Sequence, residues 1–147
     1  MSERSSPPPE PTFFIDRCLG FYELPAILRE AGMQIRTHKE AGYVHDTEDV
    51  VWIPEVAAAG LVILTKDKDI RRTRLELVVT LEAKAFYFTL GKADRSAKEN
   101  ARIILHHRRT IERLVAHSEP PVIAQINGGE VLRRLPNGTL KEVKRRA

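Results

Sequence analysis

The sequence predicts an α/β fold of three layers, in which helices cover both faces of a central, mainly parallel β-sheet. Short apolar runs typical of buried strands alternate along the chain with stretches whose apolar residues recur at helical spacing. This strand–helix alternation is typical of parallel sheets. The length of 147 residues and the hydrophobic content of 42% fit one globular domain of ordinary size. A C-terminal β-hairpin is expected to extend the sheet.

The first half of the chain supplies three strands and two helices. In order, these are a strand at 12–15, a helix at 21–31, a strand at 33–37, a helix at 47–59 and a strand at 61–65. Gly32 is a natural end for the first helix. Asp46 or Thr47 is expected to cap the second helix, which must also accommodate Pro54. The polar residues 38–47 are expected to form a loop.

The second half continues the alternation and ends in a hairpin. In order, the expected elements are a basic helix at 70–83, a strand at 85–90, a long helix from 97 to about 117, and a strand at 122–126. Ser96 and Glu99 form a capping box at the start of the long helix. Two further strands, at 131–135 and 139–143, flank the turn sequence Pro136-Asn137-Gly138.

The ends of the chain and its composition exclude several classes of protein. Residues 1–11 contain four of the nine prolines and are expected to be a disordered leader, which leaves 12–147 as a single domain. No apolar stretch approaches the ~18 residues that a membrane span needs. The N-terminus lacks the features of a signal peptide, so we expect a cytoplasmic protein. The single cysteine, Cys18, excludes an internal disulfide and a cysteine-cluster metal site.

Charge is distributed unevenly along the chain. Residues 1–69 carry 7 Lys and Arg against 12 Asp and Glu, whereas the overall formal charge is +4, so the second half is strongly basic. An acidic half that holds a metal beside a basic half that holds phosphate suits a nuclease. Two ordinary solvated faces are the alternative interpretation.

Acidic residues follow two of the expected strands. Asp16 follows the strand at 12–15, and Asp67 and Asp69 follow the strand at 61–65. Sites in open α/β sheets form beyond the carboxyl ends of the strands, so these carboxylates meet if the two strands are neighbours. Carboxylate oxygens are preferred ligands of Mg²⁺ and Mn²⁺. The alternative is that all three acids simply form turns.

With these acids in view, the chain resembles the PIN domain family, in particular short PIN-like proteins related to VapC-type toxins of bacterial toxin–antitoxin pairs. The resemblance covers roughly residues 12–90 and is carried by three segments. These are Phe14-Ile15-Asp16, the pair Glu48-Asp49, and the run Thr65-Lys66-Asp67-Lys68-Asp69. Asp49 precedes Thr65 by sixteen residues, which is the spacing typical of such proteins.

The resemblance implies a metal-dependent endoribonuclease, the toxin of a type II toxin–antitoxin system, that acts on RNA with bound Mg²⁺ or Mn²⁺. It implies that Asp16, Asp49 and Asp67 bind the metal, and that Asp69 binds it directly or through water. Thr65 would orient a carboxylate by a hydrogen bond. Glu48 competes with Asp49, because a shift of one residue exchanges them. The family also implies a cognate antitoxin as partner and a possible homodimer.

Basic residues near the acidic run are the expected RNA contacts. They are Lys66, Lys68, Arg71, Arg72 and Arg74. The arginines at 102, 108, 109 and 113 form either a second RNA-binding face or a solvated helix face. The histidines at 38 and 45 are expected to be solvated loop residues, with substrate contact as the alternative. Aromatic residues are few, so base stacking is not expected to be the main source of RNA affinity.

Two other functions remain open on the sequence alone. One is a PIN-like module that binds RNA or protein without cutting it. The other is a phosphotransferase that uses Asp-x-Asp as nucleophile and acid, although that chemistry usually places the motif after the first strand. A homodimer is expected to use the apolar edge near residues 122–126 together with the hairpin.

Overall fold

The computed structural model describes residues 10–44, 47–66, 74–90, 95–126, 131–134 and 140–143. Every predicted strand and helix has a counterpart among these residues. The elements are β1 (Thr12–Ile15), η1 (Arg17–Leu19), α1 (Glu23–Glu30), β2 (Gln34–Thr37), α2 (Asp49–Ala58), β3 (Val62–Lys66), α3 (Arg74–Glu82), β4 (Phe86–Leu90), α4 (Ala97–His106), α5 (Arg108–His117), β5 (Val122–Ile126), β6 (Val131–Arg134) and β7 (Leu140–Val143).

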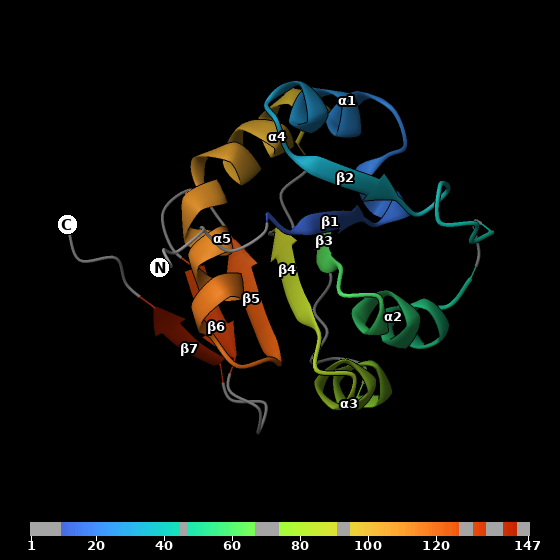
Figure 1. The fold of residues 1–147 in the computed structure, drawn as a ribbon, viewed down its shortest axis with the longest axis vertical. Helices are drawn as coiled ribbons and strands as arrows, with labels where there is room; N and C mark the ends of the chain where they lie inside the picture. Colours follow the sequence, from blue (N-terminus) through green and yellow to red (C-terminus); the bar gives the residue numbers. More distant parts are fainter. Residues whose placement is uncertain are drawn as a thin grey trace, which may run out of the picture.

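The strands form one sheet in the order β2-β1-β3-β4-β5-β6-β7 (Figure 1). The first five of these are parallel, and β6 and β7 are antiparallel to their neighbours. The α/β prediction with a mainly parallel sheet is therefore confirmed. β1 and β3 are direct neighbours, with Ile15 opposite Leu64. The residues that follow these two strands consequently lie at the same edge of the sheet, which is where sites form in such folds.

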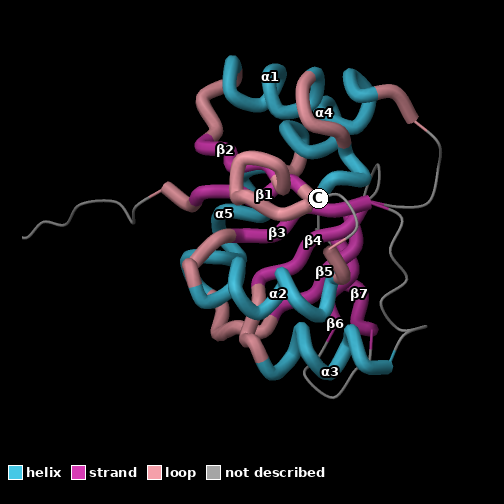
Figure 2. Tube along the Cα trace, turned by 90° about the vertical axis from the view of Figure 1, so that its right-hand side faces the viewer, coloured by secondary structure: helices cyan, strands magenta, loops and turns pink. Residues whose placement is uncertain are grey.

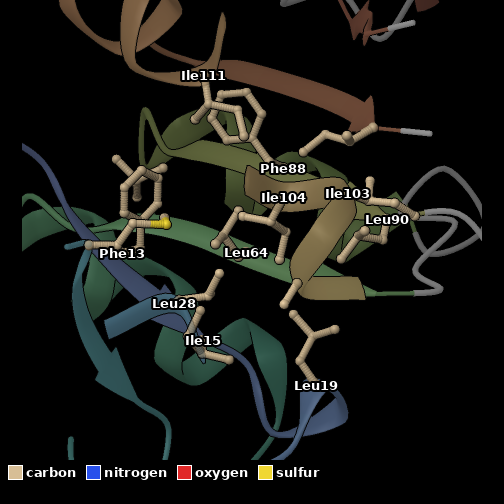
Figure 3. Close-up of a cluster of buried hydrophobic side chains, with 14 of the residues drawn as sticks. Phe13, Ile15, Leu19, Leu28, Leu64, Phe88, Leu90, Ile103, Ile104 and Ile111 are labelled. Atoms are coloured by element: carbon tan, nitrogen blue, oxygen red, sulfur yellow. The ribbon is translucent and has the colours of Figure 1, made fainter. Parts of the chain in front are cut away.

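Helices cover both faces of the sheet, as the strand–helix alternation predicts (Figures 1 and 2). On one face, α1, α4 and α5 pack over a cluster that includes Ile15, Leu64 and Phe88, all fully buried (Figure 3). On the other face, α2 and α3 cover a cluster built around Phe14, Trp52 and Tyr87. Because strands with two covered faces bury most of their side chains, β1, β3 and β5 are mostly apolar.

The long helix predicted from 97 to about 117 is wrong, because the structure divides it into α4 and α5. His107 separates them with φ −98° and ψ 6°, and its N–H binds the carbonyls of Ile103 and Ile104. Ile104 and Ile111 are both fully buried on the same face of the sheet. Their spacing of seven residues suits one straight helix or two shorter ones, so periodicity does not reveal the break. The predicted cap at Ser96 is present and accepts the Glu99 N–H at 3.1 Å.

Helix α2 begins later than predicted. The expected cap at Asp46 or Thr47 is wrong, since Glu48 occupies the N-cap with extended backbone and makes no side-chain cap hydrogen bond. Pro54 is accommodated inside the helix. Because the helix starts at Asp49, that residue is buried and Glu48 is exposed.

The edge proposed for a homodimer is not an edge. β6 pairs with β5 along its length, with Ile123 opposite Arg134 and Ile126 opposite Val131, so β5 lies inside the sheet. β7 pairs in turn with β6, and the predicted turn at 136–138 lies outside the described residues. Within the described ranges, none of the helices has the length and apolar character required to span a bilayer.

Candidate functional site

Asp16 lies where β1 ends and is held by three contacts. The residue is 2% exposed. Its Oδ1 accepts the Arg17 N–H at 2.7 Å and so caps η1. Its other oxygen, Oδ2, accepts the Thr65 hydroxyl at 2.8 Å and contacts Cys18 Sγ at 3.6 Å. Thr65 belongs to β3, so this hydrogen bond joins the ends of two neighbouring strands. Asp16 therefore has the predicted turn-forming role, as the cap of η1, and also links the ends of β1 and β3.

Asp49 reaches the same region from the first turn of α2. It is 5% exposed, and its Oδ1 accepts the indole N–H of Trp52 at 3.0 Å. Trp52, one helical turn later, is itself 1% exposed, so the donor is fixed by packing. Glu48 is exposed and lies on the outer side of the same helix start. Of the two competing acids, Asp49 is the one whose carboxylate turns inward.

A guanidinium group lies between the two buried carboxylates. Arg17 NH1 is 3.9 Å from Asp16 Oδ1 and 4.0 Å from Asp49 Oδ1. The same nitrogen donates to the carbonyl of Thr47 at 3.2 Å and lies 3.4 Å from His38 Nε2. Asp16 and Asp49 therefore face a common position that already holds a cationic group.

His38 is not the solvated loop residue that its polar neighbours predict. It is fully buried, with its backbone N–H bonded to the Ile15 carbonyl at 3.0 Å. Its ring lies among three aromatic rings, with centroid distances of 6.1 Å to Phe14, 5.4 Å to Tyr43 and 6.0 Å to Trp52. His38 thus supports Arg17 from the core side. His45 lies outside the described residues.

A cleft of about 210 Å³ opens beside these groups. Its lining residues are Arg17, Glu48, Asp49, Val50 and Glu76. Glu76, in the first turn of α3, is a residue that the sequence reasoning missed. Its position in the helix that follows the acidic run is the signal that would have suggested it.

Tyr87 lies beneath the acidic groups on the central strand β4 and is 1% exposed. Burial raises the pKa of its phenol well above the usual value, and the negative charges of Asp49, Asp16 and Glu76 raise it further. These three carboxylates therefore act on one side chain, and the phenol stays neutral. Several acids thus contribute to one negative field at this edge of the sheet.

The two acids predicted to follow β3 are Asp67 and Asp69, and both lie outside the described residues. Lys68, Arg71 and Arg72 lie outside them as well. Lys66 is the last residue of β3, and Arg74 is the first of α3. β3 therefore ends one residue after Thr65, whose hydroxyl binds Asp16.

The arginines of the second predicted basic face, on α4 and α5, are partly neutralised by acidic and carbonyl groups of the protein itself. Arg102 binds Glu99 at 2.7 Å, and Arg108 binds Glu112 at 2.9 Å and the Ala31 carbonyl at 2.9 Å. Both guanidinium groups therefore have acidic or carbonyl partners within the protein. Arg109 and Arg113 are exposed on α5.

Cys18 ties η1 to the end of β3. Its Sγ lies 3.2 Å from Thr65 Oγ1 and accepts the Lys66 backbone N–H at 3.3 Å. Although the residue is exposed, its thiol end packs against these groups. Burial of the thiol, with the nearby Asp16 carboxylate, raises its pKa from 9.0 to about 11.

Because its pKa is raised, the Cys18 thiol is expected to react slowly with alkylating reagents. In the metal-free protein at pH 8, Cys18 is expected to react with iodoacetamide about 100-fold more slowly than in the urea-unfolded chain, since only the thiolate reacts. Between pH 9 and 11 the unfolded chain releases this proton and the folded chain retains it. The free energy of unfolding is therefore expected to fall as pH rises through that window. Alkylation kinetics in EDTA test the first expectation, and equal rates for the folded and unfolded chains would contradict it.

The residues present suit a hard divalent cation. Asp16 and Asp49 offer carboxylate oxygens, which Mg²⁺ and Mn²⁺ prefer, and Arg17 shows that a cationic group is held between them. Within the parts of the chain that are described, no three His, Cys, Asp or Glu side chains gather closely enough to hold a metal on their own. A complete site therefore requires a further ligand, and Asp67 is the predicted residue nearest along the chain to Thr65.

Comparisons with known proteins identify the family of the chain. A family model described as "PIN like domain" matches residues 11–92, which span β1 to β4 and so include Asp16, Asp49 and Thr65. The chain is also 30% identical over 125 residues to a protein of Mycobacterium tuberculosis (strain ATCC 25618 / H37Rv) that is named "Putative ribonuclease VapC45". That alignment covers 83% of this chain and 90% of the relative. No solved structure gives a significant match.

Proposed function

The chain belongs to the PIN-like domain family, and from that premise we propose that it is a metal-dependent endoribonuclease, the toxin of a type II toxin–antitoxin pair. The observation that carries the proposal is the meeting of two buried carboxylates at one edge of the sheet. Asp16 comes from the end of β1 and Asp49 from the start of α2, and both face the Arg17 guanidinium. The name of the 30% identical relative supports RNA as the substrate.

In the proposed site, Asp16, Asp49 and Asp67 hold Mg²⁺ or Mn²⁺, with Asp69 as a further ligand or a partner through water. The bound metal would lower the pKa of an attacking water and neutralise charge on the phosphodiester as it is cleaved. A cation of this kind needs carboxylates that do not move. The Thr65 hydroxyl holds Asp16, and the Trp52 indole holds Asp49.

Other charged residues in and near the cleft would affect how closely the anionic RNA approaches the site. The acidic cluster repels a phosphodiester unless its charge is neutralised, so metal and Arg17 together make the cleft accessible to an anion. The proposed phosphate contacts end β3, follow it in the sequence or open α3; they are Lys66, Lys68, Arg71, Arg72 and Arg74. Tyr87 stays protonated beneath the cluster and adds no charge to it.

The proposed partner is a cognate antitoxin that covers the site. This part of the proposal is supported by the similarity to the relative with a VapC name. A homodimer remains a prediction without a located interface, because β6 covers the strand that was expected to form it.

Cleavage of a mixed RNA pool by the purified protein tests the proposal. We expect cleavage with Mg²⁺ or Mn²⁺, and loss of cleavage both in EDTA and in the Asp67→Asn variant. Cleavage that continues in EDTA would contradict the metal requirement. Absence of cleavage with either metal, with RNA or protein binding retained, would indicate a non-catalytic binding module instead.

A further inference from the structure

A second groove lies between the start of α1 and the end of β2. It encloses about 470 Å³, and its lining residues are Phe21, Tyr22, Ala26, Arg29, Thr37, Lys39 and Glu40. The lining contains two aromatic rings, two cationic side chains and one carboxylate. None of its residues belongs to the predicted catalytic or RNA-binding set.

Both walls of the groove connect to the end of β1, which carries Asp16. One wall, Phe21 and Tyr22, follows η1, which Asp16 caps. The other wall continues from β2, whose last residue, Thr37, pairs with Ile15 in the register of the sheet. Neighbouring strands lie about 4.8 Å apart, so Thr37 is one strand spacing from the end of β1. The wall at Thr37 therefore begins beside the strand end that Asp16 follows.

Tyr22 is an exposed and fixed aromatic ring. The residue is 71% exposed, and Phe21 contacts its ring edge-on, with a centroid distance of 6.2 Å and an interplanar angle of 78°. Lys39 Nζ donates to the Tyr22 hydroxyl at 3.1 Å and lies 5.6 Å from the ring centroid. These two distances differ by about the distance from the ring centre to the hydroxyl oxygen. That is the difference expected when Nζ lies roughly on the line from the ring centre through the hydroxyl oxygen. The ammonium group therefore lies beyond the hydroxyl end of the ring and does not cover a face.

The base of the groove is polar and internally neutralised. Glu40 accepts the Thr37 backbone N–H at 3.0 Å and binds Arg29 at 2.7 Å, while Thr37 Oγ1 accepts the Glu40 N–H at 3.0 Å. These bonds hold the loop after β2 in one conformation and pair the Arg29 charge with the Glu40 carboxylate. The positive charge that the groove offers a ligand is consequently that of Lys39.

We propose that this groove binds one nucleoside of the RNA strand next to the phosphodiester at Asp16 and Asp49. The base stacks on Tyr22, and Lys39 contacts the adjoining phosphate. Stacking of unpaired bases on exposed aromatic rings, beside a cation that follows the backbone, is the usual way in which proteins hold single strands. The inference rests on the proposed function for its substrate, and it locates that substrate on the β2 side of the site.

RNA affinity measured without cleavage tests the groove. The parent protein is the Asp16→Asn variant in Mg²⁺, and the readout is fluorescence anisotropy of an end-labelled mixed-sequence RNA of ten nucleotides. Tyr22→Ala and Tyr22→Leu are expected to weaken binding about tenfold, because stacking requires the aromatic face. Tyr22→Phe is expected to stay within about twofold of the parent, since it keeps that face.

The charge contribution has its own matched pair of variants. Lys39→Gln is expected to weaken binding and to lower the slope of log affinity against log salt by about 0.7, as for one phosphate contact on a single strand. Lys98→Gln, which removes an exposed cation on α4, is the control and is expected to change neither quantity. All of these side chains are exposed, so thermal melts are expected to match the parent.

If Tyr22→Ala and Lys39→Gln both bind RNA within twofold of the parent affinity, the proposal that the groove binds RNA is contradicted. Unchanged RNA affinity with weaker binding of a co-expressed partner protein would also overturn it and assign the surface to protein docking. The proposal for the groove and the proposal of ribonuclease activity can be contradicted independently. If the variants weaken RNA binding but the native protein cuts no RNA, the groove is supported and the catalytic proposal is rejected. If the native protein cuts RNA but the variants bind it with unchanged affinity, the catalytic proposal is supported and the groove is rejected.

Discussion

Asp16→Asn is expected to lower the rate of RNA cleavage at least about 100-fold, because loss of one anionic metal ligand removes several kcal/mol of stabilisation from the reaction. The amide can still accept the Arg17 N–H, but it offers the metal no negative charge. The buried position of Asp16 makes replacement by an outside water difficult, since the residue is 2% exposed. The measurement is single-turnover cleavage of one labelled RNA under saturating Mn²⁺.

Glu48→Gln is the matched control for this loss of charge. Glu48 lines the same cleft but is exposed and lies outside the pair of carboxylates that faces Arg17. Its substitution is expected to keep the cleavage rate within about threefold of native, as for an exposed charge screened by solvent. Similar losses in Asp16→Asn and Glu48→Gln would mean that general acidity of the cleft, and not a defined ligand, supports cleavage.

Trp52→Ala is expected to lower the free energy of unfolding by about 3–5 kcal/mol, the usual cost of removing a large buried aromatic side chain. Trp52 is 1% exposed, and its ring lies 5.0 Å from that of Phe14 in the cluster between the sheet and α2. The measurement is urea unfolding followed by circular dichroism. A loss below about 1 kcal/mol would contradict the packing described for this face.

Trp52→Phe separates packing from the hydrogen bond to Asp49. Phenylalanine keeps an aromatic ring in the cluster but has no donor for Asp49 Oδ1, which now receives the indole N–H at 3.0 Å. Loss of a partner that orients a metal ligand typically costs 10- to 100-fold in metal affinity or activity, and we expect about that loss here. An unchanged metal affinity in Trp52→Phe would show that α2 alone orients Asp49.

The sequence predicts the sheet well because its central strands are covered on both faces. The strands at 12–15 and 122–126 match β1 and β5 in both bounds. Continuous apolar runs bounded by turn residues have few alternative interpretations in a chain of alternating elements. The division of α4 from α5 is different in kind, because it depends on one backbone conformation at His107, to which apolar spacing is insensitive.

The surroundings of Asp16 and Asp49 could not be predicted from the sequence. His38 is buried because three aromatic rings from separate segments close around it, and its polar neighbours in sequence carry no sign of them. Arg17 was overlooked because its importance is geometric: one nitrogen lies about equally far from two carboxylates that are 33 positions apart in the chain. Tertiary contacts of this kind have no periodic signature.

Direct binding of Mn²⁺, followed by electron paramagnetic resonance of the metal, tests the central claim that Asp16 and Asp49 belong to one divalent-cation site. The native protein is expected to bind Mn²⁺, Glu48→Gln to bind it with similar affinity, and Asp16→Asn and Asp49→Asn to bind it at least about tenfold more weakly. Equal Mn²⁺ affinity in the native protein and both asparagine variants would contradict the account.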